Sequence, residues 1–138
     1  MLDPLPPDVR RLATGVLALR VTVAVLLAIH GWFRFLTGGY APFGEYLAGA
    51  GWPLGGVIAI AITAYEILGT PLLAWGRLVL PLCAGYVFIL TAGMLMVHAS
   101  SGWFVVGGGR NGMEYSVLLI ACLLLVAYQE LPRGARSR

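Results

Sequence analysis

Five ionisable side chains lie within or at the ends of stretches that are otherwise apolar. They are arginine, histidine and glutamate, the residue types that proton transfer and the binding of polar groups require. They are Arg20, His30, Glu66, His98 and Glu114. A charged group inside a bilayer costs at least about 2.5–3.5 kcal/mol on insertion scales, so such groups normally face the protein interior and have partners. A histidine beside a carboxylate can transfer a proton or hydrogen-bond a small polar head group. These five residues are therefore the first candidates for a functional site.

Arg20 and Glu66 are predicted to form an ion pair inside the protein. At about 1.5 Å rise per residue, Arg20 lies roughly 12 Å from the inner end of the first apolar stretch, and Glu66 roughly 14 Å from the inner end of the second. Similar depth would allow the two side chains to meet. Such a pair either fixes the register of two helices or takes part in chemistry.

A polar cluster is predicted at the other end of the apolar stretches, which is expected to face the outside of the membrane. Its members are His30, Arg34, His98, Arg110 and Glu114. His30 and Arg34 lie one helical turn apart and so share a helix face. We interpret the cluster as a ligand-binding site in which His98 and Glu114 are the candidate catalytic groups. The alternative is an interfacial hydrogen-bond network that holds no ligand.

Metal binding and redox-cysteine chemistry are not predicted. Two histidines and one carboxylate could ligate iron or zinc, but no spacing in the sequence puts them on one helix face. Cys83 and Cys122 lie far apart in apolar stretches, without the C-x-x-C spacing of a redox pair or a zinc site. Both are expected to be small buried hydrophobic residues.

The elements that must position these residues are membrane helices. The chain has 138 residues, only 11% of them charged, and a mean hydropathy of +0.87, whereas soluble domains are usually about 25% charged. Four apolar stretches are long enough to cross a bilayer as helices, at about 12–33, 54–75, 78–98 and 112–131. The predicted fold is one all-α membrane domain over residues 1–138, a four-helix transmembrane bundle.

Arginine counts predict the orientation, because short positive loops stay in the cytoplasm. One side carries Arg10, Arg11, Arg77, Arg133, Arg136 and Arg138. The other side carries Arg34 and Arg110. Both termini are therefore expected in the cytoplasm, and the protein in the inner (cytoplasmic) membrane. No basic stripe with interleaved aromatics suggests nucleic acid, so the lipid bilayer is the expected partner.

Two local features are expected to shape the bundle. The segment 45–52 is predicted to lie as a short interfacial helix. Pro71 has no N–H, so it deprives the carbonyl of Ile67 of its helical hydrogen-bond donor and should kink the second apolar helix one turn beyond Glu66.

The order of these groups resembles that of the DoxX family of small four-span membrane proteins. The motifs that carry the resemblance are Leu19-Arg20, His30-Gly31-Trp32-Phe33-Arg34, Tyr65-Glu66-Ile67-Leu68-Gly69, Val97-His98 and Gly112-Met113-Glu114-Tyr115. They extend over about residues 14–128. The family usually has lysine where this chain has Arg34, and often a longer Ser-Leu-Asp tail where it has residues 133–138.

This resemblance implies an integral membrane partner of a redox enzyme. Relatives named DoxD belong to a thiosulfate:quinone oxidoreductase, and other DoxX proteins are linked to oxidative-stress complexes. The chain has no haem or flavin fingerprint, so we expect at most a membrane subunit of an oxidoreductase, with quinone as the ligand of the outer cluster. Two alternatives stay open: a non-enzymatic assembly factor or structural partner, and a small transporter or proton pathway through Glu66. A homo-oligomer is kept as an open alternative for the assembly state.

Overall fold

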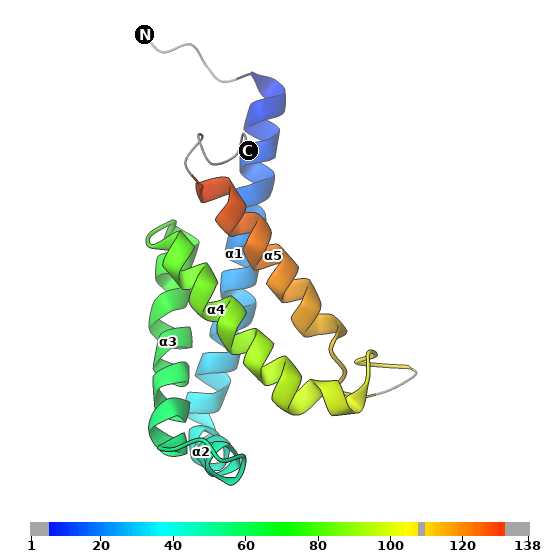
Figure 1. Cartoon of the computed structure of the whole chain (residues 1–138). Helices are drawn as coiled ribbons and strands as arrows, with labels where there is room; N and C mark the ends of the chain where they lie inside the picture. The colour runs from blue at the N-terminus through cyan, green and yellow to red at the C-terminus, as the bar shows by residue number, and fades with distance from the viewer. Residues whose placement is uncertain (1–5, 108–109, 132–138) are drawn as a thin grey trace. The chain divides into compact units, whose positions relative to one another are not determined.

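The computed structural model of the protein describes residues 6–107 and 110–131 (Figure 1). Its elements, in chain order, are α1 (Pro7–Leu36), α2 (Tyr40–Gly49), α3 (Gly55–Trp75), α4 (Val79–Gly93), a π-helical turn η1 (Met94–His98), a short 3-10 helix η2 (Ala99–Ser101) and α5 (Glu114–Glu130). No strand occurs within the described ranges. The prediction of an all-α fold is confirmed.

Within the residues that the structure describes, three helical segments are long and apolar enough to cross a membrane. They are Pro7–Leu36, Gly55–Trp75 and Val79–Ser101. α5 has 17 residues, which corresponds to about 26 Å of helix against roughly 30 Å of hydrocarbon. Many large apolar side chains on these helices are exposed, for example Leu68 and Phe88 at 68% each, as expected for surfaces that face lipid.

Contacts divide the chain into two compact units, and α1 contributes to both. One unit comprises residues 24–77, that is, the second half of α1 with α2 and α3. The other comprises the first half of α1 together with α4, η1, η2 and α5.

In the unit of residues 24–77, α2 packs directly on the first turn of α3 (Figure 1). The contact is made by glycines, because a Cβ on Gly44 would lie 2.7 Å from Cα of Gly56, and a Cβ on Gly55 would lie 2.5 Å from the carbonyl oxygen of Gly44. The segment 45–52, predicted as an interfacial helix, falls in α2 and the turn that follows it. That turn reverses the chain at Gly51, whose φ is 86°.

In the other unit, α4 and α5 pack against each other through buried apolar faces. Leu82 and Tyr86 on α4, and Leu119 and Leu123 on α5, are at most 6% exposed. α4 ends in the π-helical turn η1, after which the chain returns to α5 through a loop. Three backbone hydrogen bonds join residues 102–104 to residues 112–114 and close this loop.

Candidate functional site: an ion pair beside an apolar cavity

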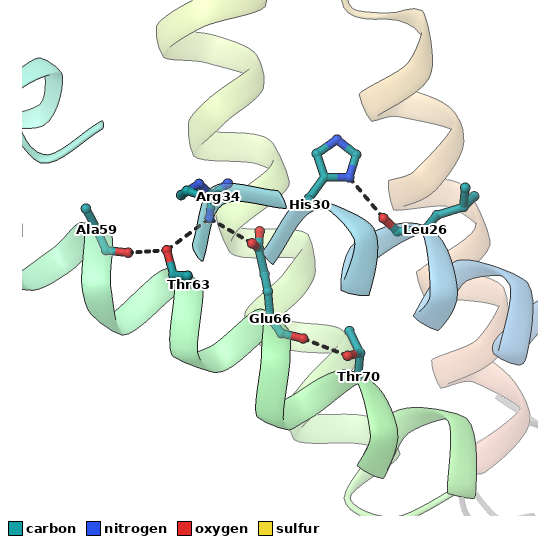
Figure 2. A network of polar contacts seen from close by, with 7 residues as sticks. All are labelled: Leu26, His30, Arg34, Ala59, Thr63, Glu66 and Thr70. Carbon is teal, nitrogen blue, oxygen red and sulfur yellow. Dashed lines mark hydrogen bonds and ion pairs between the residues drawn. The ribbon is translucent and has the colours of Figure 1, made fainter. Parts of the chain in front are cut away.

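The strongest polar contact in the unit of residues 24–77 is an ion pair between Arg34 on α1 and Glu66 on α3. Nη1 of Arg34 lies 2.7 Å from Oε2 of Glu66, and the two side chains are 21% and 6% exposed, respectively. Figure 2 shows the guanidinium directed at both the carboxylate and the hydroxyl of Thr63. The carboxylate is thus held in an apolar helix by one cationic partner, as buried charges require.

Two threonines on α3 secure the backbone around this pair. The hydroxyl of Thr63 donates to the carbonyl of Ala59 at 2.8 Å and accepts from Arg34 at 3.4 Å. The hydroxyl of Thr70 donates to the carbonyl of Glu66 at 2.7 Å (Figure 2). Both threonines are at most 4% exposed. Each satisfies its hydroxyl inside its own helix, which suits a site with little water.

The guanidinium of Arg34 also lies over an aromatic ring from α2. Its Cζ atom is 4.9 Å from the centroid of the Phe43 ring, which is a cation–π distance. α2 therefore covers one side of the Arg34–Glu66 pair, and the glycine contacts between α2 and α3 set how close that cover lies.

The point at which α1 crosses α3 lies at Gly31. A Cβ on Gly31 would lie 2.7 Å from Cβ of Glu66 and 3.2 Å from Cγ1 of Ile67, so the helices approach closely at this point because Gly31 has no side chain. Arg34 stands three residues beyond Gly31, almost one turn along α1. Its long side chain reaches back to the carboxylate from there.

The predicted Arg20–Glu66 pair is replaced in the structure by two other pairs. Glu66 binds Arg34, and Arg20 binds Glu130 at the end of α5, with 3.3 Å between Nη1 and Oε1. The prediction compared depths counted from the ends of the apolar stretches. The actual register is set by the close approach at Gly31, and α1 is also longer at both ends than the stretch 12–33.

His30 lies beside the ion pair on α1 but is oriented differently. Its Nδ1 is 2.9 Å from the carbonyl oxygen of Leu26, one turn earlier in the same helix. Figure 2 shows the ring directed away from the carboxylate of Glu66. The structure thus brings Arg34 and Glu66 into direct contact and leaves His30 at the margin of the site.

An apolar cavity of about 430 Å³ adjoins the ion pair. Its lining consists of Trp32, Phe35, Tyr40, Ile60, Thr63, Ala64, Ile67 and Leu68. Thr63 contributes to this lining and is also hydrogen-bonded to Arg34, so the cavity has a polar point in an apolar wall. Trp32 and Phe35 meet edge to face, with 6.1 Å between ring centroids. An apolar cleft of 300–1,000 Å³ with a few polar groups is typical of small-molecule sites.

Comparison with known protein families identifies the same part of the chain. A sequence model of the DoxX family matches residues 15–99, which include the ion pair and the whole cavity lining. The chain belongs to the DoxX family. No curated protein and no solved structure matches it. With its long apolar helices, this DoxX chain is an integral multi-pass membrane protein in contact with the lipid bilayer.

Two further predicted site residues of the DoxX chain, His98 and Glu114, bind the loop between α4 and α5. Nδ1 of His98 lies 2.7 Å from the carbonyl oxygen of Asn111. Oε1 of Glu114 accepts a hydrogen bond from the backbone N–H of Val105 at 3.0 Å. Arg110 is exposed in the same loop. These contacts give His98 and Glu114 a structural role in closing the loop; their convergence with His30 and Arg34 stays a prediction.

Removing the Glu114 carboxylate should loosen this loop. In a Glu114→Leu variant the Val105 N–H loses a charged acceptor, a bond worth roughly 1.5–3 kcal/mol. We expect the amides of Val105, Gly112 and Met113 to exchange hydrogen at least about tenfold faster. Ser100→Ala, which removes only a 3.4 Å bond to the Val97 carbonyl, should leave these rates unchanged. Unaltered exchange in Glu114→Leu would mean that the carboxylate does not hold the loop.

The remaining expectations concern cysteines and metals. Cys83 is 1% exposed, and Cys122 is partly buried; neither is paired in a disulfide. Within residues 6–107 and 110–131, the structure holds no group of three histidine, cysteine or acidic side chains placed to bind a metal ion.

Proposed function

We propose that this DoxX chain is a membrane subunit of a redox enzyme and that it binds a quinone in the cavity beside Arg34. The observation that carries the proposal is an apolar, aromatic-lined cavity whose lining residue Thr63 is hydrogen-bonded to Arg34, which itself lies just behind that lining. Quinones have an apolar ring and chain with two carbonyl oxygens that accept hydrogen bonds. Family membership supports the association with a redox enzyme.

Arg34 is suited to bind a carbonyl oxygen. Both of its polar contacts, to Thr63 and Glu66, use Nη1, whereas a guanidinium carries five N–H groups on three nitrogens. The other N–H groups can donate to a ligand while the ion pair with Glu66 persists. The Trp32, Phe35 and Tyr40 side chains offer aromatic surface to the quinone ring.

In this proposal the partner enzyme supplies the electrons. Reduction of a quinone to a quinol consumes two electrons and two protons; in this proposal the electrons come from a redox group of the partner and the protons from water at the membrane surface. The role of the DoxX chain is to bind and orient the quinone within the membrane. Arg34 stabilises the negative charge that develops on the quinone oxygen as electrons arrive.

The topology that goes with this role has four spans in the inner membrane and both termini in the cytoplasm. α5 serves as the fourth span, since 17 helical residues need only a few more at the ends to cover the hydrocarbon. Arg10, Arg11 and Arg77 support the orientation, because Arg10 and Arg11 lie near the start of α1 and Arg77 just after the end of α3, the two helix ends that would face the cytoplasm. The cavity, near the other end of α1, would then lie in the outer half of the membrane.

Quenching of tryptophan fluorescence tests the quinone site. A variant that keeps Trp32 and has phenylalanine at positions 52, 75 and 103 is reconstituted in liposomes and titrated with a short-chain benzoquinone. We expect saturable quenching, because Trp32 lines the cavity. A matched variant that keeps only Trp103, which is outside the cavity lining, should show only linear, collisional quenching. Linear quenching of both tryptophans would contradict the proposal.

The partner is tested by native mass spectrometry of protein extracted gently from its own membranes. A co-purifying oxidoreductase supports the proposed role. An unrelated membrane client in its place would favour an assembly factor, and a homo-oligomer without other proteins would count against both roles. Retained lipids and quinones are identified in the same measurement.

A further inference from the structure

In α3 the carbonyl of Ile67, a residue that lines the cavity, has no N–H donor four residues ahead. Pro71 lies inside α3 and has no N–H, so the carbonyl of Ile67 loses its usual donor four residues ahead. The nearby Thr70 hydroxyl does not compensate, because it donates to the carbonyl of Glu66 at 2.7 Å. In lipid an unsatisfied carbonyl costs several kcal/mol, and membrane helices normally give it another donor.

This carbonyl lies on the face of α3 that forms the cavity wall. Ile60, Ala64, Ile67 and Pro71 follow one another at i, i+4, i+7 and i+11, which is a single helix face. The first three line the cavity. Helical carbonyls point along the axis toward residue i+4. The oxygen of Ile67 therefore lies at the end of the cavity wall next to Pro71, which is itself exposed.

The cavity thus has a hydrogen-bond donor and an acceptor at different points. The donor is the guanidinium of Arg34, which is not itself a lining residue but is hydrogen-bonded to Thr63, which is. The acceptor is the carbonyl of Ile67, one helical turn from Thr63, or about 6 Å along the axis. A ring with two oxygens on opposite sides can span a separation of this order. The two groups make different demands on the ligand, because one requires a lone pair and the other requires an O–H.

We propose that the cavity binds the reduced, hydroxyl-bearing quinol more tightly than the oxidised quinone. One hydroxyl of the quinol donates to the carbonyl of Ile67, and its other oxygen accepts from Arg34. A quinone can make only the second contact. This inference rests on the proposed quinone site and adds the form of the ligand that the site prefers.

The size of the preference follows from one hydrogen bond. A net contribution of a typical hydrogen bond corresponds to a roughly two- to tenfold difference in Kd. A tenfold preference for the quinol would raise the two-electron reduction potential of the bound couple by about 30 mV. The site would therefore make bound quinone easier for the partner enzyme to reduce.

The test compares three probes on the reconstituted protein. They are a short-chain benzoquinone, its hydroquinone kept reduced under anaerobic conditions, and the dimethyl ether of that hydroquinone, which has no O–H. The Kd of the benzoquinone is measured from its own quenching of Trp32 fluorescence. The Kd values of the hydroquinone and the dimethyl ether are measured from their competition against that quenching. We expect the hydroquinone to bind about two- to tenfold more tightly than the quinone, and the dimethyl ether to show no such gain. This comparison uses the unmodified cavity and needs no variant at Pro71.

Pro71→Ala then locates the effect. Alanine supplies the missing N–H to the carbonyl of Ile67, so the preference for hydroquinone should disappear while the Kd for quinone changes less than twofold. The control is Pro81→Ala in the first turn of α4. First-turn N–H groups have no acceptor within the helix, so this variant should retain the preference.

The outcomes separate this inference from the function on which it rests. If none of the probes binds saturably, the proposed quinone site is wrong. If quinone binds but hydroquinone binds no better, or if the dimethyl ether binds as well as hydroquinone, the site stands and the quinol preference is wrong. If hydroquinone is preferred and Pro71→Ala keeps that preference, the Ile67 carbonyl is not the acceptor and the inference fails.

Discussion

Replacing Glu66 by leucine should lower the free energy of unfolding by about 3 kcal/mol, because it leaves the Arg34 guanidinium without its anion. Breaking a buried ion pair by removing one partner typically costs about 3–5 kcal/mol. We expect the lower end of this range, because Arg34 is 21% exposed and can turn its head group toward the membrane interface. The measurement is reversible unfolding of the protein in mixed micelles by added SDS, followed by tryptophan fluorescence.

A double variant shows whether the loss comes from the pair. Arg34→Met with Glu66→Leu removes both charges and keeps apolar volume, so it should be more stable than Glu66→Leu alone. Glu45→Leu replaces an exposed carboxylate on α2 and should change stability by less than about 0.5 kcal/mol. If Glu66→Leu were as stable as Glu45→Leu, the ion pair would contribute nothing to the fold.

Gly55→Ala should destabilise the protein by about 1–3 kcal/mol, because the new methyl group has no space. It would lie 2.5 Å from the carbonyl oxygen of Gly44 and 2.6 Å from the amide nitrogen of Ala48. Both are backbone atoms, so α2 itself must move, and overpacking of this kind typically costs 1–3 kcal/mol. The same SDS unfolding experiment measures the loss, and amide exchange in α2 should accelerate.

The adjacent glycine provides the control for this substitution. A Cβ on Gly56 would meet nothing within 4 Å, and alanine loses less backbone conformational freedom on folding than glycine does. Gly56→Ala should therefore be neutral or stabilising, which is the opposite sign for the same chemical change one residue away. Equal effects of the two substitutions would mean that α2 does not pack on α3 through these glycines.

The contact between α2 and α3 also bears on the proposed ligand site. α2 contributes Tyr40 to the cavity lining and Phe43 to the cation–π contact with Arg34. A displaced α2 would change both. Gly55→Ala should therefore weaken quinone quenching of Trp32 as well as lower stability, whereas Gly56→Ala should leave the quenching unchanged.

Much of the helical framework could be predicted because membrane helices follow simple rules. An apolar stretch of about 20 residues must be helical in lipid, since no water is present to satisfy its backbone. The end of α3 was predictable for the same kind of reason. Gly76 has a φ of 80°, and glycine adopts this left-handed conformation readily at the end of a helix.

The members of the site could also be predicted, but their partners could not. Arg34 and Glu66 were recognised individually because ionisable groups in apolar helices are rare and costly. The expected pairing of Glu66 with Arg20 depended on equal depth, which is a property of two helices and not of either one alone. One available signal was Gly31, since a glycine inside a helix often marks a close approach of another backbone.

His98 and Glu114 show a second limit of reasoning from residue type. A histidine and a carboxylate at the ends of adjacent helices are suitable proton-transfer groups, and this chemistry was predicted for them. In the structure His98 binds the backbone of Asn111 and Glu114 binds the backbone of Val105, whereas the proton-transfer role stays a prediction. Backbone partners in a loop depend on its conformation, and no residue pattern in the sequence specified them.

The sequence by itself determined that this protein is an all-helical membrane protein of the DoxX family and which ionisable residues its apolar helices carry. Only the tertiary structure decided that Glu66 binds Arg34, that α2 covers this pair, and that the apolar cavity opens beside them. The physical reason lies in the range of the forces involved. Hydropathy and backbone hydrogen bonding act within one helix, whereas pairing and cavities depend on the crossing points that glycines such as Gly31 and Gly55 permit.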